Sequence, residues 1–201
     1  MIVVVDYGMG NLHSVGKALE AAGGEVTVSG EAGEVARAGK LVLPGVGAFA
    51  DAKAELDRRG LTRPVLEHIR SGRKFLGICL GLELLMERSH EDGVHEGLGV
   101  LRGEVVRFSA TGLKVPHIGW NTIETTAGGA GLFAGVPPGS YVYFVHSYYV
   151  TCEDEGVVAA RTEYGERFTS AVATRNIWAT QFHPEKSQEV GLAMLRNFVG
   201  W

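Results

Sequence analysis

Cysteine is scarce in this chain, since Cys79 and Cys152 are the only two among 201 residues. Two cysteines do not make the disulfide framework that stabilises many small secreted domains, so that class of fold is excluded. We therefore expect a reducing, cytoplasmic environment, in which a free thiol stays reactive. We interpret Cys152 as a structural residue.

A basic surface and long apolar runs are also missing. The 19 Lys and Arg against 23 Asp and Glu give a net charge of −4, which argues against nucleic acid as a partner. No apolar run approaches the length of a membrane span. Met1–Asp6 has no basic region before its apolar residues, so we expect a strand there and not a signal peptide. The spacing of His90 and His95 matches no metal-ligand pattern, and we expect no metal and no cofactor.

The order of elements predicts a single α/β domain over residues 1–201. Strands and helices alternate at first, with strands expected at 2–5, 25–29, 40–43 and around Phe75, and helices at 11–22, 48–59, 64–71 and 82–88. Later segments are mostly strand-like, at 100–101, 104–108, 119–124, 141–150, 157–162, 168–173 and 177–181, before a closing helix at 187–199. This predicts three layers: a mostly parallel central sheet with helices on both faces, and a β-rich, partly antiparallel second half.

The segment Gly77-Ile78-Cys79-Leu80-Gly81 lies between an apolar strand and a helix. A nucleophile flanked at two residues by glycines is typical of the nucleophile elbow, a turn so tight that only glycine fits beside it. The N-terminus of a following helix favours a thiolate, which is the reactive form of cysteine. The pattern therefore predicts that Cys79 is a nucleophile, whereas a small buried core cysteine is the alternative.

A cysteine nucleophile needs a base, and the base needs an orienting group. His183-Pro184-Glu185 follows an apolar strand and precedes the last helix. If that strand is parallel to the strand before Cys79, both carboxyl ends lie on the same edge of the sheet. We expect His183 to be the base and Glu185 its orienting carboxylate. A surface loop is the alternative.

Attack on an amide also needs an oxyanion hole, that is, fixed N–H donors facing the developing negative charge. The N–H of Leu80, the residue after the nucleophile, is one candidate. The loop Pro44-Gly45-Val46-Gly47 is a second, because its glycines let backbone N–H groups turn toward a ligand. A plain strand-to-helix turn is the alternative for this loop.

Together, the elbow and His183-Pro184-Glu185 resemble the class I (triad) glutamine amidotransferases, whose glutaminase domains carry G-x-C-x-G-x-Q and a late H-P-E. The resemblance covers essentially the whole chain. Within that family, further segments are similar to the glutaminase subunits of imidazole glycerol phosphate synthases, at residues 6–11, 44–47, 116–121, 144–148 and 182–187.

The resemblance implies that Cys79, His183 and Glu185 hydrolyse glutamine through a glutamyl thioester, with Leu80 and either Val46 or Gly47 at the oxyanion. It also implies a substrate site lined by Gly45, Glu83, Ser147 and Tyr148. Glu83 departs from the family, which usually has Gln there. A carboxylate only accepts hydrogen bonds, so it would suit the ammonium of glutamine and repel its carboxylate.

The resemblance further implies a partner, a (β/α)8 cyclase subunit that uses the ammonia in histidine biosynthesis, because we expect the glutaminase fold to take up all 201 residues. The expected interface residues are Trp120, Asn121, Tyr143 and Lys186; core positions for the two aromatic residues are the alternative. The family pattern also suggests that the Val46–Gly47 peptide gates the glutaminase until the partner is loaded.

Parts of the sequence fit other functions. Gly8-Met9-Gly10 follows a strand as in dinucleotide-binding proteins, but the third glycine position is His13 and Val28-Ser29 supplies no acidic residue. A different cysteine hydrolase of the same fold, a silent binding subunit, and the glutaminase subunit of an anthranilate or pyridoxal phosphate synthase are further alternatives.

Overall fold

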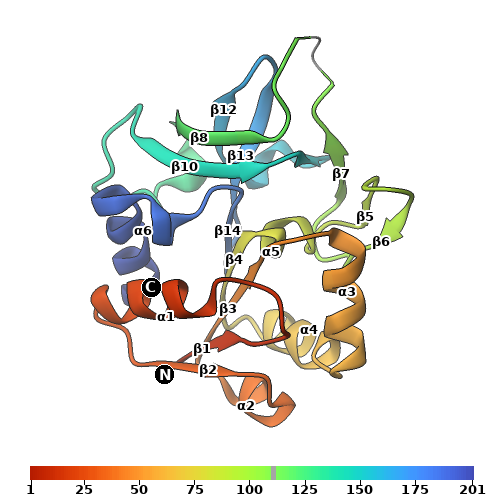
Figure 1. Ribbon diagram of the computed structural model, residues 1–201. Helices are drawn as coiled ribbons and strands as arrows, with labels where there is room; N and C mark the ends of the chain where they lie inside the picture. Colours follow the sequence, from red (N-terminus) through yellow and green to blue (C-terminus); the bar gives the residue numbers. More distant parts are fainter. Residues whose placement is uncertain (110–111) are drawn as a thin grey trace.

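The computed structural model describes residues 1–109 and 112–201 (Figure 1). The first part alternates strands and helices: β1 (Ile2–Val5), α1 (Leu12–Ala21), β2 (Val26–Ser29), α2 (Ala32–Arg37), β3 (Lys40–Gly45), α3 (Phe49–Arg58), α4 (Thr62–Arg70), β4 (Lys74–Cys79) and α5 (Leu80–Glu83). The second part holds β5 (Arg88–Ser89), β6 (His95–Glu96), β7 (Gly103–Arg107), β8 (His117–Thr122), β9 (Glu124–Thr125), β10 (Tyr141–His146), β11 (Tyr148–Cys152), β12 (Val158–Glu163), β13 (Arg167–Ala173), β14 (Ile177–Thr180) and α6 (Gln188–Gly200).

The large sheet is mixed, and its strand order is β2-β1-β3-β4-β14-β13-β11-β7-β5-β6, with β12 and β9 added beside β13. Strands β2, β1, β3, β4 and β14 are parallel to one another, whereas β13, β11 and β7 continue the sheet in antiparallel fashion. A parallel half followed by an antiparallel half confirms the predicted α/β class. Strands β4 and β14 are parallel neighbours, so the end of β4 at Cys79 and the end of β14 before His183 lie at the same edge of the sheet, as expected.

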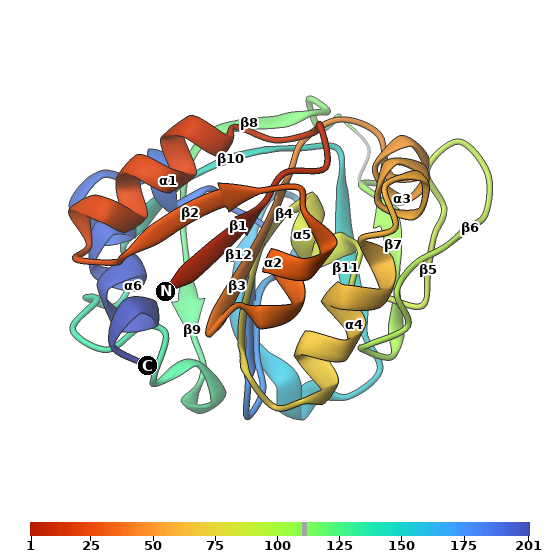
Figure 2. The same ribbon diagram turned by 90° about the horizontal axis from the view of Figure 1, so that it is seen from below.

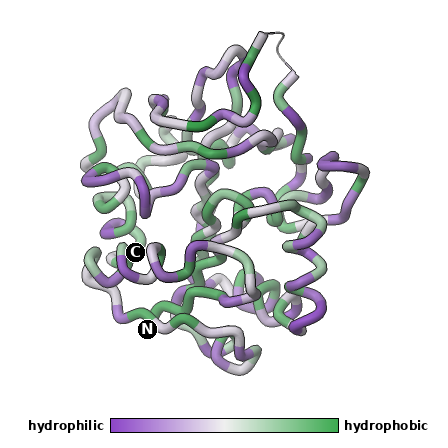
Figure 3. The backbone as a smooth tube through the Cα atoms, in the orientation of Figure 1, coloured by the Kyte–Doolittle hydropathy of each residue, from purple (hydrophilic) through white to green (hydrophobic). Residues whose placement is uncertain are grey.

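Helices cover both faces of the parallel half (Figure 2). Successive residues of the strands point to opposite faces of the sheet and contribute to two hydrophobic cores. One core packs against α1 and α6, and the other packs against α2, α3 and α4. Hydrophobic residues follow the strands, and hydrophilic residues gather on the outer helices and loops (Figure 3). In the described part of the chain, no helix is long and apolar enough to cross a membrane.

The first helix shows how local sequence sets the boundaries. The side chain of Asn11 accepts a hydrogen bond from the backbone N–H of Ser14 and so caps the start of α1. The N–H groups of Gly23 and Gly24 bond back to carbonyls of the last turn, and Gly23 has a φ of +91°, which glycine adopts without strain. The helix predicted at 11–22 therefore agrees with α1 to within one residue at each end.

The helix expected at 82–88 is wrong. The helix after Cys79 contains only Leu80–Glu83, and the chain then turns into β5. The carbonyls of Leu84, Leu85 and Met86 accept hydrogen bonds from the loop at residues 98–101, which replaces the helical bonds. That loop is irregular, so the strand expected at 100–101 is wrong as well.

The single strand expected at 141–150 is also wrong. It is two strands, β10 and β11, separated by Ser147. Strand β10 pairs with β8 in a separate two-stranded sheet, whereas β11 belongs to the large sheet. Ser147 therefore forms a one-residue junction between the two sheets.

Candidate active site

Cys79 occupies the turn between β4 and α5 with a φ of 54° and a ψ of −109°, a left-handed region that non-glycine residues rarely adopt. The flanking glycines make the turn possible. A Cβ added at Gly77 would lie 2.7 Å from the carbonyl oxygen of Gly81, and one added at Gly81 would overlap the carbonyl oxygen of Leu43. The strained geometry of a nucleophile elbow is therefore present.

His183 and Glu185 lie just after β14, the strand next to β4. Nδ1 of His183 is 2.8 Å from Oε1 of Glu185, and the two side chains are only 2% and 1% exposed. This burial excludes a surface loop. Nε2 of His183 is buried and has no hydrogen-bond partner in the described part of the chain, so it is the ring nitrogen available for proton transfer.

The sulfur of Cys79 lies in an environment that disfavours the thiolate. Burial raises the pKa of the thiol, and the carboxylates of Glu83 and Glu185 raise it further, whereas the N–H of Leu80 and the amide of Gln181 lower it. The expected thiolate is therefore not favoured in this structure. The physical reason is that α5 has only one turn, so its N-terminus offers little positive charge against burial and two carboxylates.

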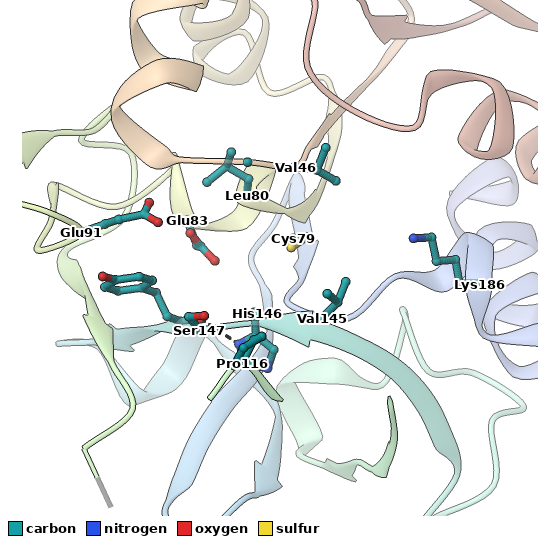
Figure 4. Close-up of a pocket in the computed structure, with 12 residues that line it drawn as sticks. Val46, Cys79, Leu80, Glu83, Glu91, Pro116, Val145, His146, Ser147 and Lys186 are labelled. Carbon is teal, nitrogen blue, oxygen red and sulfur yellow. Dashed lines mark hydrogen bonds between the residues drawn. The ribbon is translucent and has the colours of Figure 1, made fainter. Parts of the chain in front are cut away.

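The loop after β3 lies on the same side of Cys79 as Leu80 (Figure 4). Gly45 is buried, and a Cβ there would overlap the hydroxyl of Tyr7 and lie 2.8 Å from Cβ of Leu80, so only glycine fits. Val46 and Gly47 are exposed, and Gly47 has a φ of +98°. The loop is thus held at Gly45 and open at the two residues expected to supply an oxyanion donor.

A cleft of about 460 Å³ opens beside Cys79. It is lined by Val46, Gly47, Cys79, Leu80, Glu83, Glu91, Pro116, Val145, His146, Ser147, Tyr148 and Lys186. Of the four residues expected to bind substrate, Glu83, Ser147 and Tyr148 line it, whereas Gly45 is buried behind the lining. Glu83 and Glu91 lie on one side of Cys79 and Lys186 on the other (Figure 4), so the cleft has an acidic end and a basic end.

The acidic end is built from buried contacts. Oε1 of Glu83 accepts a hydrogen bond of 2.7 Å from Nε2 of Gln181, which also lies 3.9 Å from the sulfur of Cys79. Burial raises the pKa of Glu83 to about 7, and the charge of Glu91 contributes to the shift. Oε2 of Glu91 accepts a hydrogen bond of 2.6 Å from the N–H of Phe49 at the start of α3. Two carboxylates at one end of a cleft suit a cationic group of a ligand.

The expected interface residues include Lys186, which forms the basic end of the cleft. Trp120 is 46% exposed and contacts the ring of Tyr143 edge-on, at a centroid distance of 6.0 Å. Nζ of Lys186 lies 5.8 Å from the centre of the same ring. Trp120 is therefore not a core aromatic residue, and three of the four residues form one patch. The side-chain amide of the fourth residue, Asn121, makes intramolecular hydrogen bonds, to the ring of His117 and to the carbonyl of Glu163.

Comparison with known proteins decides the family. The family described as glutamine amidotransferase class-I matches residues 3–200. The chain belongs to the class-I glutamine amidotransferases.

Curated relatives of this amidotransferase carry a narrower name. The imidazole glycerol phosphate synthase subunit HisH of Syntrophotalea carbinolica is 53% identical over 204 residues, which cover 98% of each chain. The protein of the same name from Aquifex aeolicus is 53% identical, over 98% of this chain and 94% of its own. Among solved structures, PurLQS from Thermotoga maritima matches with a TM-score of 0.76 and 18% identity, over 99% of this chain and 96% of its own. At that identity the likeness shows the fold alone.

Sequence reasoning missed three residues of the amidotransferase site: Gln181, Glu91 and His146. Gln181 directly precedes Phe182 and His183, so its position two residues before the base was a usable signal. Glu91 was hidden because the helix expected at 82–88 placed it far from Cys79. His146 is adjacent to the expected substrate residue Ser147, but a histidine at the end of a strand carries no signal of its own. In residues 1–109 and 112–201, no three His, Cys, Asp or Glu side chains converge to hold a metal ion.

Proposed function

We propose that this chain is the glutaminase subunit of an imidazole glycerol phosphate synthase and that it hydrolyses L-glutamine with Cys79, His183 and Glu185. The observation that carries the proposal is the strained Cys79 turn at the end of β4, next to β14, which is followed by a buried His–Glu pair. The relatives named as this synthase subunit, which are 53% identical and align over nearly their full length, support the choice of synthase.

The first half of the reaction forms a thioester. Nε2 of His183 takes the thiol proton, and the sulfur attacks the side-chain carbonyl carbon of glutamine. The N–H of Leu80 and one from Val46 or Gly47 stabilise the oxyanion. The protonated His183, held by Glu185, then gives its proton to the departing nitrogen, which leaves as ammonia. Because burial opposes an isolated thiolate, proton transfer is coupled to the arrival of the substrate.

The second half restores the enzyme. Water enters where ammonia left, and Nε2 of His183 takes one of its protons as the oxygen attacks the thioester. The same donors stabilise the second oxyanion, and its collapse breaks the carbon–sulfur bond. The sulfur recovers its proton from His183, and glutamate leaves.

Substrate orientation follows from the charge of the cleft. The ammonium of glutamine points to Glu83 and Glu91, which puts the side-chain amide at Cys79. Ser147 and Tyr148 contact the amino-acid head, and Gly45 acts indirectly by holding the loop against Leu80. Glu83 in place of Gln then gives a stronger acceptor for the ammonium, at the cost of a buried carboxylate.

The ammonia passes to a second chain, a cyclase subunit with a (β/α)8 barrel, which docks over Trp120, Tyr143 and Lys186. The exposed aromatic patch beside the basic end of the cleft supports this location. Asn121 supports the patch from behind. The Val46–Gly47 peptide is the gate that withholds the second oxyanion donor until the cyclase binds its ligand. We also propose one glutaminase domain over residues 1–201 and a cytoplasmic location, which suits the free Cys79.

The test compares glutamine hydrolysis by the isolated chain, the chain with the cyclase, and the complex with the acceptor ligand. We expect the rate to rise at each step, and we expect Cys79→Ser to reduce kcat at least about a thousandfold without loss of fold. Equal rates with and without the cyclase would refute the gate. An active Cys79→Ser variant would refute the triad. Peptidase activity in place of glutaminase activity would favour the other cysteine hydrolases, and co-purification with another synthase would favour the other subunits.

A further inference from the structure

A chain of side-chain hydrogen bonds crosses the core between the patch and the cleft. Nδ2 of Asn121 lies 3.3 Å from Nε2 of His117, and Nδ1 of His117 lies 2.9 Å from Nε2 of His146. Nδ1 of His146 lies 2.7 Å from the carbonyl oxygen of Tyr148. Neither histidine has a role in the proposed chemistry, yet His146 lines the cleft and Asn121 lies beside Trp120.

The direction of every bond in this chain is determined. A carbonyl oxygen only accepts, so Nδ1 of His146 carries the hydrogen, and its Nε2 accepts from Nδ1–H of His117. Nε2 of His117 is then left to accept from the amide of Asn121. That amide is itself oriented, because Nδ2 donates to the carbonyl of Glu163 at 2.9 Å and Oδ1 accepts from the N–H of Thr122 at 2.8 Å. All donors point from the patch toward the cleft.

The surroundings keep both rings neutral. His117 and His146 are 3% and 6% exposed. His117 is stacked between the rings of Phe144 and Tyr164, at centroid distances of 4.8 and 3.9 Å. Burial lowers the pKa of His117 to about 4 and that of His146 to about 3. A proton added to His146 would set two N–H groups against each other across its 2.9 Å contact with His117. A proton added to His117 would set its Nε2–H against the amide hydrogens of Asn121.

The chain ends at the junction between the two sheets. His146 is the last residue of β10 and Tyr148 the first residue of β11, so their hydrogen bond closes around Ser147. Ser147 and Tyr148 line the cleft, where the proposed function puts the amino-acid head of glutamine. The conformation of this junction therefore depends on where His146 is held, and His146 is held by His117.

We propose that His117 and His146 are positioning residues for glutamine: as a neutral pair with one fixed direction of hydrogen bonding, they hold the Ser147–Tyr148 junction in the shape that binds the amino-acid head. This inference rests on the proposed function. It assigns to a core histidine pair an effect on substrate affinity, with none on the chemical step, since neither ring contacts the reacting atoms.

The test uses the complex with the cyclase and compares His117→Leu, which removes the donor, with His117→Asn, whose amide can donate from nearly the position of Nδ1. Thr162→Val is the matched control. It removes a hydrogen bond of 3.0 Å from β12 to the carbonyl of Thr122 on β8, and it leaves the hydrogen bonds from Asn121 through the two histidines to Tyr148 in place. We expect His117→Leu to raise KM for glutamine about tenfold with kcat within about twofold. His117→Asn should stay within about threefold of wild type, and Thr162→Val should leave KM unchanged.

An unchanged KM in folded His117→Leu, or an equal KM rise in His117→Asn, would overturn the proposal. If His117→Leu does not fold, ¹⁵N spectra of the wild-type imidazoles decide: both must be neutral with hydrogen on Nδ1, and any other state of either ring overturns it. Failure of the proposed function would look different, since the wild-type complex would then hydrolyse no glutamine.

Discussion

Gln181 donates a hydrogen bond from Nε2 to Oε1 of Glu83 over 2.7 Å, and the same nitrogen lies 3.9 Å from the sulfur of Cys79. An ionised Glu83 can only accept, so it fixes which end of the Gln181 amide faces inward. A Gln at this position would leave that choice open. Glu83 therefore acts on both the acidic end of the cleft and the surroundings of the nucleophile.

Replacing Glu83 should change how glutamine affinity depends on pH. The pKa of Glu83 is raised to about 7, so its carboxylate is ionised mainly above that pH. If it pairs with the ammonium, wild-type KM falls as pH rises through about 7, and Glu83→Gln removes this step. Steady-state kinetics of the complex from about pH 6 to 8 measure it. A wild-type KM that instead rises with pH would place Glu83 beside the substrate carboxylate.

Ionisation of Glu83 should lower stability although it improves glutamine binding, so the same substitution should also change how stability depends on pH. The pKa of Glu83 is 4.5 in the unfolded chain and about 7 in the folded chain, so the folded state holds the proton more tightly. Wild type therefore loses stability as pH rises from 4.5 to about 7, and the loss is complete above that. Glu83→Gln should be more stable than wild type by on the order of 3 kcal/mol near pH 8, and the difference should vanish near pH 4.5.

Urea unfolding of the isolated chain at both ends of this pH range supplies the measurement. His117 and His146, whose folded pKa values are lowered, destabilise the chain as pH falls, but they do so equally in both proteins and cancel in the comparison. A pH-independent difference between the two proteins would contradict the prediction.

The elbow glycine should be irreplaceable. Gly81→Ala forces a methyl group into the carbonyl oxygen of Leu43, and we expect a loss of more than about 3 kcal/mol of stability. Gly16→Ala in α1 is the matched control, since its new methyl would meet only Cγ2 of Val28 at 3.7 Å. The control should gain about 0.5 to 1 kcal/mol from helix propensity. Similar unfolding midpoints for the two variants would show that the turn can relax.

Removing the exposed indole should weaken cyclase binding. Trp120→Ala is expected to raise Kd about thirtyfold or more, because buried aromatic anchors dominate interfaces. Val94→Ala, at a residue that is 68% exposed between β5 and β6, is the control and should bind as wild type does. Isothermal titration calorimetry with the cyclase measures the Kd of each variant. An unaffected Trp120→Ala complex would move the interface elsewhere.

Local sequence predicted most strands and helices of the parallel half, although not α2, because the signals for them are short-range. Ile2–Val5 is apolar on both faces, as a central parallel strand must be, and its predicted limits agree with the structure. The glycines around Cys79 predicted its turn because the clash that Gly77 avoids is local, with the carbonyl oxygen of Gly81. The contact between His183 and Glu185 was predictable for the same reason, since only Pro184 separates the two residues.

Long-range contacts account for the errors. Leu84, Leu85 and Met86 have good helix propensity, but their carbonyls bond a loop more than ten residues away, and tertiary bonding outweighs propensity. Residues 141–150 are uniformly strand-like, and only the second sheet explains the break at Ser147. Glu91 became visible only when distant segments met beside Cys79.

The one-residue junction at Ser147 limits how this protein can be re-engineered. Strands β8 and β10 look like a detachable hairpin, and grafting the hairpin of a relative would be the obvious way to redirect the enzyme to a new acceptor. However, only Ser147 separates β10 from β11, and the carbonyl of Tyr143 on β10 also accepts a hydrogen bond from the backbone N–H of His183. A graft would disturb the substrate contact and the base together, so partner choice and turnover in this chain must be redesigned as a unit.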